Sequence, residues 1–218
     1  MKRIALLLLC ALGYSCGDDG GNPQAATTDL VIRSASDLRS WRPRASIGGD
    51  LIIENTDLTD LEQLEQLESI GGSLTVRNNP ALANLEALRN LADIGFDLII
   101  ENNDQLQSIG GLRNVAQVGQ VGQELVGKIR ISLNRSLQNV DGLQLLKVIH
   151  GDLNISNNDQ LVGLDGFANL VLVEGSVVIL QNQRLSQLDG FGNLTTVGGS
   201  LFIDGNSNLT SLASLIAL

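Results

Sequence analysis

The sequence has few of the residues on which most enzymatic and metal-binding chemistry depends. Its 218 residues include one histidine, His150, and two cysteines, Cys10 and Cys16. One histidine is little material for a Ser-His-Asp triad or a histidine-rich metal site, and no Walker-type phosphate loop occurs. His150 stands in a variable turn, where we expect an ordinary surface residue. We therefore expect a protein that is not an enzyme and that has no metal site and no cofactor.

Disulfides, basic residues and aromatic residues are also scarce. No cysteine follows Cys16, so no disulfide framework can hold the rest of the chain. Lys and Arg total 14 against 24 Asp and Glu, which gives a net charge of −10. This balance argues against nucleic acid as a partner, because phosphate binding needs a basic patch, and we expect none. Aromatic residues make up only 3% of the chain, which favours a core of aliphatic layers.

One pattern, repeated seven times, fills the chain from Ile47 onward. Each copy opens with an apolar residue, continues into an L-x-I strand and ends in leucines spaced by three. A spacing of three fits an irregular or 3₁₀-like back wall. The opening residues are 23, 24, 31, 24, 24 and 24 positions apart: Ile47, Ile70, Ile94, Leu125, Ile149, Val173 and Val197. Such a period is typical of a solenoid, whose units must stack to bury their apolar faces. We expect a β-rich, right-handed, single-sheet stack of about seven 24-residue coils, similar to leucine-rich repeats.

Alternation along each strand separates the inward side chains from the outward ones. The two residues that flank the middle of the strand are apolar in every copy, so we place them in the core: Leu51/Ile53, Leu74/Val76, Leu98/Ile100, Ile129/Ile131, Leu153/Ile155, Val177/Ile179 and Leu201/Ile203. In six copies a glycine stands two residues before the strand, and Phe96 replaces it in the third. Glycine suits a sharp turn into a strand.

An asparagine follows the strand in all seven copies: Asn55, Asn79, Asn103, Asn134, Asn158, Asn182 and Asn206. Solenoid corners leave backbone groups without partners in the sheet. An inward amide can satisfy these groups and bond to the asparagine of the next coil. Because every coil carries this residue, we interpret the column as a structural asparagine ladder and not as a catalytic or ligand-binding set.

The first coil differs from the others and is expected to cap the stack. Residues 30–32 are predicted to form its strand. Ser34 is a candidate helix N-cap, with Asp37 three residues later. Trp41, the only tryptophan, is expected to cover the open end of the core, as solenoid caps do.

The combination G-x-L-x-I-x-x-N-x-x-L-x-x-L-x-x-L-x-x-[IV] resembles the receptor L domain, a relative of leucine-rich repeats that forms the ligand-binding lobes of insulin- and EGF-type receptors. The resemblance covers about residues 30–218. The repeats contain no cysteine, so the chain is more similar to bacterial members, which are often secreted or lipid-anchored. The resemblance implies a binding role. It supplies no catalytic residue or ligand, since the family shares neither.

The amino terminus has the features of an export signal. A basic start precedes an apolar run over residues 4–12, which is too short to span a bilayer. Cys16 and the Gly and Asp residues after it resemble a bacterial lipoprotein signal, in which this cysteine carries the lipid. Gly13 and Tyr14 depart from that pattern, and ordinary cleavage with Cys16 incidental is the alternative. We expect a signal peptide over residues 1–15, a lipidated Cys16 with a flexible tether over 16–28, and the solenoid over 29–218.

Two features depart from the repeat and are candidates for binding. The outward mid-strand column is apolar in four of seven coils, and its candidate residues are Ile52, Ile99, Arg130, Val178 and Phe202. An exposed apolar patch can mark a partner site, although β-propensity alone would also explain it. The second feature is an insertion of seven residues at about 117–123 (QVGQVGQ), which is either a loop on the binding face or a neutral bulge.

Together these features predict a cell-surface recognition or adhesion domain that binds a protein, peptide or glycan through its strand face. The alternative is a structural cell-envelope lipoprotein that associates through the solenoid ends. In either case we expect an exported protein of the cell envelope, as an outer-membrane lipoprotein or at the cell surface, that contacts the membrane through its lipid only. The final leucines, Leu212, Leu215 and Leu218, close the core unless the chain is truncated or another chain covers them.

Overall fold

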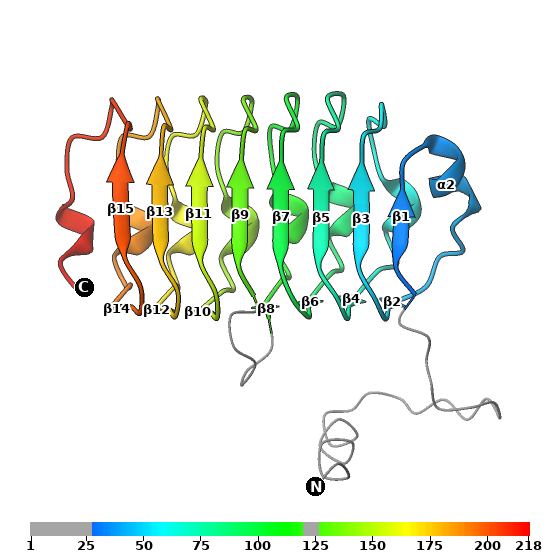
Figure 1. The fold of residues 1–218 in the computed structure, drawn as a ribbon, viewed down its shortest axis with the longest axis horizontal. Helices are drawn as coiled ribbons and strands as arrows, with labels where there is room; N and C mark the ends of the chain where they lie inside the picture. Colours follow the sequence, from blue (N-terminus) through cyan, green and yellow to red (C-terminus); the bar gives the residue numbers. More distant parts are fainter. Residues whose placement is uncertain (1–27, 120–126) are drawn as a thin grey trace, which may run out of the picture.

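A stacked sheet of parallel strands runs along one side of the molecule (Figure 1). The computed structural model describes residues 28–119 and 127–218. In these residues the main sheet has eight strands, and each lies beside the strand of the next coil: β1 Leu30–Ile32, β3 Leu51–Glu54, β5 Leu74–Arg77, β7 Leu98–Glu101, β9 Ile129–Ser132, β11 Leu153–Ser156, β13 Val177–Leu180 and β15 Leu201–Asp204. A large parallel stack with few helices is the β-solenoid, leucine-rich-repeat-like architecture that the period predicts.

The expectation of a single sheet was wrong, because the turn into each main strand forms short sheets of its own. The opening apolar residue of one coil pairs in parallel with that of the next, as in Ile47 with Ile70. In the described residues these two-residue strands make a four-stranded and a three-stranded sheet: β2 Ser46–Ile47, β4 Ser69–Ile70, β6 Asp93–Ile94 and β8 Gln117–Val118, then β10 Val148–Ile149, β12 Leu172–Val173 and β14 Thr196–Val197. Both lie at the lower edge of Figure 1.

The seven extra residues lie later in the chain than the sequence suggested. Val118 pairs with Ile94, so Val118 and not Leu125 opens the fourth unit. Ile129 in turn pairs with Leu98, 31 positions earlier, so the insertion falls between Val118 and Ile129. Gln117 and Val118 therefore belong to strand β8. The rest of the predicted insertion after Gly119, and Leu125 itself, lie outside the described residues.

The core is a continuous column of aliphatic layers between the main sheet and a back wall of short 3₁₀ helices. The inward strand residues are fully buried from Leu51 to Ile179, and Leu82, Leu85, Leu88 and Leu91 of one back wall are buried as well. The alternation in the sequence predicted this division. The back-wall helices are η2 Glu62–Leu64, η3 Glu86–Leu88, η4 Gly110–Leu112, η5 Asp141–Leu143, η6 Asp165–Phe167, η7 Asp189–Phe191 and η8 Ala213–Leu215.

The two ends of the stack differ. At the N-terminal end, Ser34 caps helix α2 (Ala35–Ser40), and its Oγ accepts a hydrogen bond from the Asp37 N–H at 3.2 Å. Trp41 follows the helix and packs against the core. At the other end the predicted closure by leucines is only partial. Leu215 packs against the core, whereas Leu212 is 54% exposed and Leu218 is 48% exposed.

Candidate functional site

Six of the seven predicted asparagines form a buried, continuous ladder: Asn79, Asn103, Asn134, Asn158, Asn182 and Asn206. Asn103 shows the repeating unit. Its Oδ1 accepts hydrogen bonds from the backbone N–H and from Nδ2 of Asn79, both at 3.1 Å. Its Nδ2 donates to the Val76 carbonyl oxygen at 3.0 Å and to Asn134 Oδ1 at 3.1 Å. The amide thus satisfies groups at the corner that the sheet cannot reach, which is a structural role.

Asn55 does not belong to this ladder, and its assignment was wrong. Thr56 takes the ladder position, because its N–H and Oγ1 donate to Asn79 Oδ1 at 3.1 and 2.8 Å. The first interval of the repeat is 23 residues, so counting back from Asn79 leads to Thr56. Asn55 is exposed and has a φ of 55°, and Asn78 and Asn102 in the following coils have similar φ values of 56° and 55°. Asparagine tolerates this left-handed conformation better than most residues.

A second column of turn-capping residues was missed. In most coils a short polar side chain stands directly before the main strand and accepts a hydrogen bond from the next coil. Asp50 Oδ1 accepts from the Ser73 N–H at 2.7 Å, and Asp97 Oδ1 accepts from the Lys128 N–H at 3.0 Å. Asp152 Oδ1 does the same for Ser176 at 2.7 Å. The signal was present in the sequence as Asp or Ser between the glycine and the strand.

The five candidate binding residues lie in one row across the outer face of the main sheet, which we call the strand face. The register joins the mid-strand residues of all eight strands: Val31, Ile52, Thr75, Ile99, Arg130, Asn154, Val178 and Phe202. Phe202 is 57% exposed and Arg130 is exposed, whereas Ile52, Ile99 and Val178 are half-buried. At about 4.8 Å per strand, the row from Ile52 to Phe202 is about 29 Å long.

A shallow depression of about 350 Å³ lies in the strand face between β3 and β9. Ile52 and Ile99 provide apolar surface, and three cations stand around it. Two of these are already paired: Arg77 with Glu54, and Lys128 with Asp97 at 3.2 Å. Arg130 has no ion-pair partner within residues 28–119 and 127–218. The depression therefore offers apolar contact area beside one cation that is free to bind a ligand group. The residues that line it are Ile52, Thr75, Arg77, Ile99, Glu101, Lys128 and Arg130.

Opposite charges alternate along the strand face only in part. Glu54 is buried between two arginines, with Arg77 Nε at 2.8 Å from one oxygen and Arg33 Nε at 2.8 Å from the other. Hydrogen bonds from Arg77, then Arg33, hold the pKa of Glu54 below its usual value, because both favour the charged carboxylate. Glu101, the next acid in this column, instead accepts a hydrogen bond from Ser132 Oγ at 3.2 Å.

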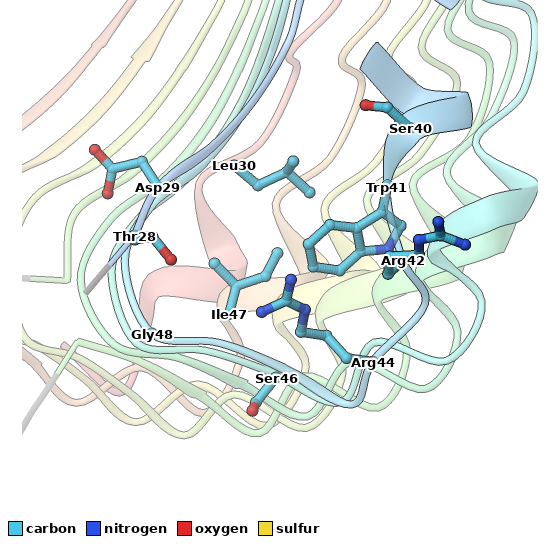
Figure 2. Close-up of a pocket in the computed structure, with 10 residues that line it drawn as sticks. All are labelled: Thr28, Asp29, Leu30, Ser40, Trp41, Arg42, Arg44, Ser46, Ile47 and Gly48. Atoms are coloured by element: carbon cyan, nitrogen blue, oxygen red, sulfur yellow. The ribbon is translucent and has the colours of Figure 1, made fainter. Parts of the chain in front are cut away.

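A second hollow, the N-terminal cavity, has a volume of about 650 Å³ and lies at the N-terminal end of the stack (Figure 2). Figure 2 looks along the stack, with the later coils behind the labelled residues. The Arg44 guanidinium lies over the indole of Trp41, 4.6 Å from the ring centroid. The indole Nε1 is buried and has no acceptor among the described residues, which costs about 1–3 kcal/mol. The cavity is lined by Thr28, Asp29, Leu30, Ser40, Trp41, Arg42, Arg44, Ser46, Ile47 and Gly48.

The remaining sequence predictions concern the histidine and the amino terminus. His150 is not an ordinary surface residue: its side chain is only 17% exposed, and its Nδ1 lies 3.2 Å from Glu174 Oε2. Cys16 and the predicted signal peptide and tether lie outside the described residues. In the part of the chain that the structure describes, no three His, Cys, Asp or Glu side chains gather into a metal site.

These observations define a parallel β-solenoid of the leucine-rich-repeat type with a mixed apolar and cationic strand face. The family model of the receptor L domain matches residues 45–142 and 122–218, which together extend through most of the chain. The chain therefore belongs to the receptor L domain family. No curated protein and no solved structure matches it.

Within residues 28–119 and 127–218, no helix has the length and hydrophobicity that crossing a bilayer would require.

Proposed function

We propose that the chain is a non-enzymatic recognition or adhesion domain, and that it binds a protein, peptide or glycan through the strand face. The observation that carries the proposal is the row of mid-strand residues. It sets Phe202, Ile99 and Arg130, which has no ion-pair partner among the described residues, on one rigid sheet. Aromatic and arginine side chains dominate many binding interfaces, and a rigid sheet orders them at low entropic cost. Membership of the receptor L domain family supports a binding role.

The proposed setting is the cell envelope. We infer that residues 1–15 direct export and that Cys16 carries a lipid, so that the solenoid is held at an outer membrane or cell surface. The basic start, the apolar run and the cysteine after Ser15 support this inference. We also propose a right-handed winding of about seven coils, because nearly all parallel strand-to-strand crossovers have that hand.

A second proposal is a structural envelope lipoprotein that associates through the solenoid ends. The apolar surface at the C-terminal end favours it, since Ile216 is 91% exposed and Leu212 is 54% exposed. The two proposals place the partner on different surfaces. Substitutions on the strand face therefore separate them.

The test compares substitutions on the strand face with matched substitutions elsewhere. The full chain is first screened against glycan and peptide arrays and against envelope extract. The affinity of each partner found is then measured for the wild type and for two double variants. Ile99→Ser/Phe202→Ser removes apolar area from the strand face. The control, Leu145→Ser/Val162→Ser, removes exposed apolar side chains outside the main sheet, where Leu145 is 47% and Val162 is 46% exposed.

We expect the strand-face variant to lose at least tenfold in affinity and the control to bind normally, with similar melting temperatures for both. Equal binding by all three proteins would contradict the proposal and favour association through the ends. Unfolding of the strand-face variant alone would show that Ile99 and Phe202 are needed for the fold.

A further inference from the structure

The N-terminal end of the stack has a charge unlike that of the rest of the molecule. Residues 28–46 contain four arginines and two aspartates, a net charge of +2. Residues 47–218 contain eight basic and 20 acidic residues, a net charge of −12. One of the four arginines, Arg33, is engaged by Glu54 on the strand face. The other three, Arg39, Arg42 and Arg44, follow within one short segment, and two of them line the N-terminal cavity.

Arg44 is held in position without being neutralised. Its guanidinium lies over the face of the Trp41 indole at 4.6 Å. A guanidinium stacked on an aromatic ring keeps its in-plane N–H groups free to bind the oxygens of an anion. Within residues 28–119 and 127–218, Arg44 has no carboxylate partner. The Trp41 ring thus preorganises a cation that has no counter-charge in the described chain.

The apolar side of the cavity lies beside this cation. In Figure 2 the side chains of Leu30 and Ile47 and the Trp41 ring surround the space that the Arg44 guanidinium enters. The Asp29 carboxylate points away from that space, and its Oδ1 accepts a hydrogen bond from the Asp50 N–H at 2.9 Å. A volume of about 650 Å³ lies within the range of small-molecule sites, about 300–1,000 Å³.

We propose that the N-terminal cavity binds an amphiphilic anion. A phosphate or carboxylate group would be held by the N–H groups of Arg44, and an attached hydrocarbon segment would lie against Leu30, Trp41 and Ile47. A free alkyl phosphate and the headgroup region of an anionic lipid share this chemistry. The cavity lies at the end of the stack and not on the strand face, so this site is independent of the proposed recognition function.

Trp41 is the only tryptophan of the chain and therefore reports directly on the cavity. The full chain is titrated with monomeric hexyl phosphate while the tryptophan emission is followed. We expect a saturable change with a Kd below about 1 mM. Hexanol, which lacks the charge, and inorganic phosphate, which lacks the chain, should each bind at least tenfold more weakly.

Two arginine variants test the assigned contact. Arg44→Gln should weaken hexyl phosphate binding at least tenfold. Arg184→Gln, which changes an exposed arginine hydrogen-bonded to Gln160 in a later coil, should leave it unchanged. Because Arg44→Gln also alters the surroundings of Trp41, calorimetry repeats each titration without the optical signal. Residues 1–27 are common to all the proteins, so they cannot produce a difference between variants.

Vesicles that contain phosphatidylglycerol distinguish the source of the anion. Arg44-dependent binding of hexyl phosphate without a response to the vesicles identifies a soluble amphiphile, and an Arg44-dependent response to the vesicles identifies a lipid headgroup. Either result supports the site. Hexanol binding as tightly as hexyl phosphate, or responses to both probes that Arg44→Gln does not change, would overturn it.

Discussion

Replacing Asn103 with alanine should reveal how strongly the asparagine ladder holds the coils together. The change removes four hydrogen bonds, two accepted by Oδ1 and two donated by Nδ2. The Asn79 backbone N–H then loses its acceptor in a fully buried position. Both bonds toward Asn79 are lost, whereas toward Asn134 the Nδ2 bond is lost and the bond from the Asn103 backbone N–H to Asn134 Oδ1 remains.

The expected cost follows from these contacts. A buried donor without an acceptor costs about 1–3 kcal/mol, and the other lost bonds and the small void add to this. We expect a total of about 2–4 kcal/mol. For a domain of this size each kcal/mol lowers the Tm by about 2–4 °C, so the Tm should fall by roughly 5–15 °C. Circular dichroism during thermal and urea unfolding measures both quantities.

The neighbouring residue gives a matched control. Asn102 is exposed and has a φ of 55°, and its Nδ2 donates to Asn78 Oδ1 at the surface. Glycine adopts this conformation without strain, so Asn102→Gly should change stability by less than about 0.5 kcal/mol. If the two variants unfold at the same temperature, the ladder does not stabilise the stack as argued.

Three further predictions test local contacts and the anchor. Glu54→Gln should lower the Tm at pH 7. Because the folded-state pKa of Glu54 is lowered, its stabilising effect is present above the ordinary glutamate pKa, about 4.3, and is lost as pH falls through the lowered value. The difference in Tm should therefore shrink in acid, and a constant difference would contradict the assignment. Leu133→Gly should raise stability by about 1 kcal/mol, since exposed Leu133 has a φ of 58°, and an unchanged or lower Tm would refute this strain. A fatty-acid probe should label the wild type and not Cys16→Ala in growing cells, and equal labelling of both would exclude Cys16 as the anchor.

Alternation and period were enough to predict the solenoid and its inward side chains. Each strand has only two faces, so an apolar pair such as Leu74 and Val76 can be buried on one side only. By the same alternation, Phe202 and Arg130 fall on the outward face. The period also predicted stacking of the strands, because equal units pair most simply with their neighbours.

Register was harder to predict wherever two residues of similar chemistry compete for one position. Asn55 fits the asparagine pattern, and only the 23-residue first interval assigns the ladder position to Thr56. Val118 stands one residue before Gly119 and Leu125 stands two residues before Gly127, so the spacing of apolar residues and glycines allows two registers. Pairing with Ile94 decides between them, and that contact is not visible in the spacing alone.

The N-terminal cavity could not be predicted for a different reason. Trp41, Arg42 and Arg44 lie in an irregular segment between helix α2 and strand β2, where no period relates side chains to the core. The cation that stacks on Trp41 is three residues away in sequence, and only the path of the chain brings Arg44 over the ring. Sequence reasoning correctly gave Trp41 a position at the end of the core but had no means of finding the space beside it.

The mid-strand column is the part of each coil that the fold constrains least. The ladder amides and turn-capping carboxylates are bonded to the next coil, as Asn103 and Asp97 show. The turn glycines are held by close backbone approach, since a Cβ on Gly72 would lie 2.7 Å from the Gly49 carbonyl carbon. Among the described residues the outward mid-strand side chains make no side-chain hydrogen bond to the next coil, so Thr, Ile, Arg, Asn, Val and Phe can all occur there. A change in that column alters the surface chemistry while the stack stays intact, so the column is where a repeat scaffold of this kind can acquire a specific ligand.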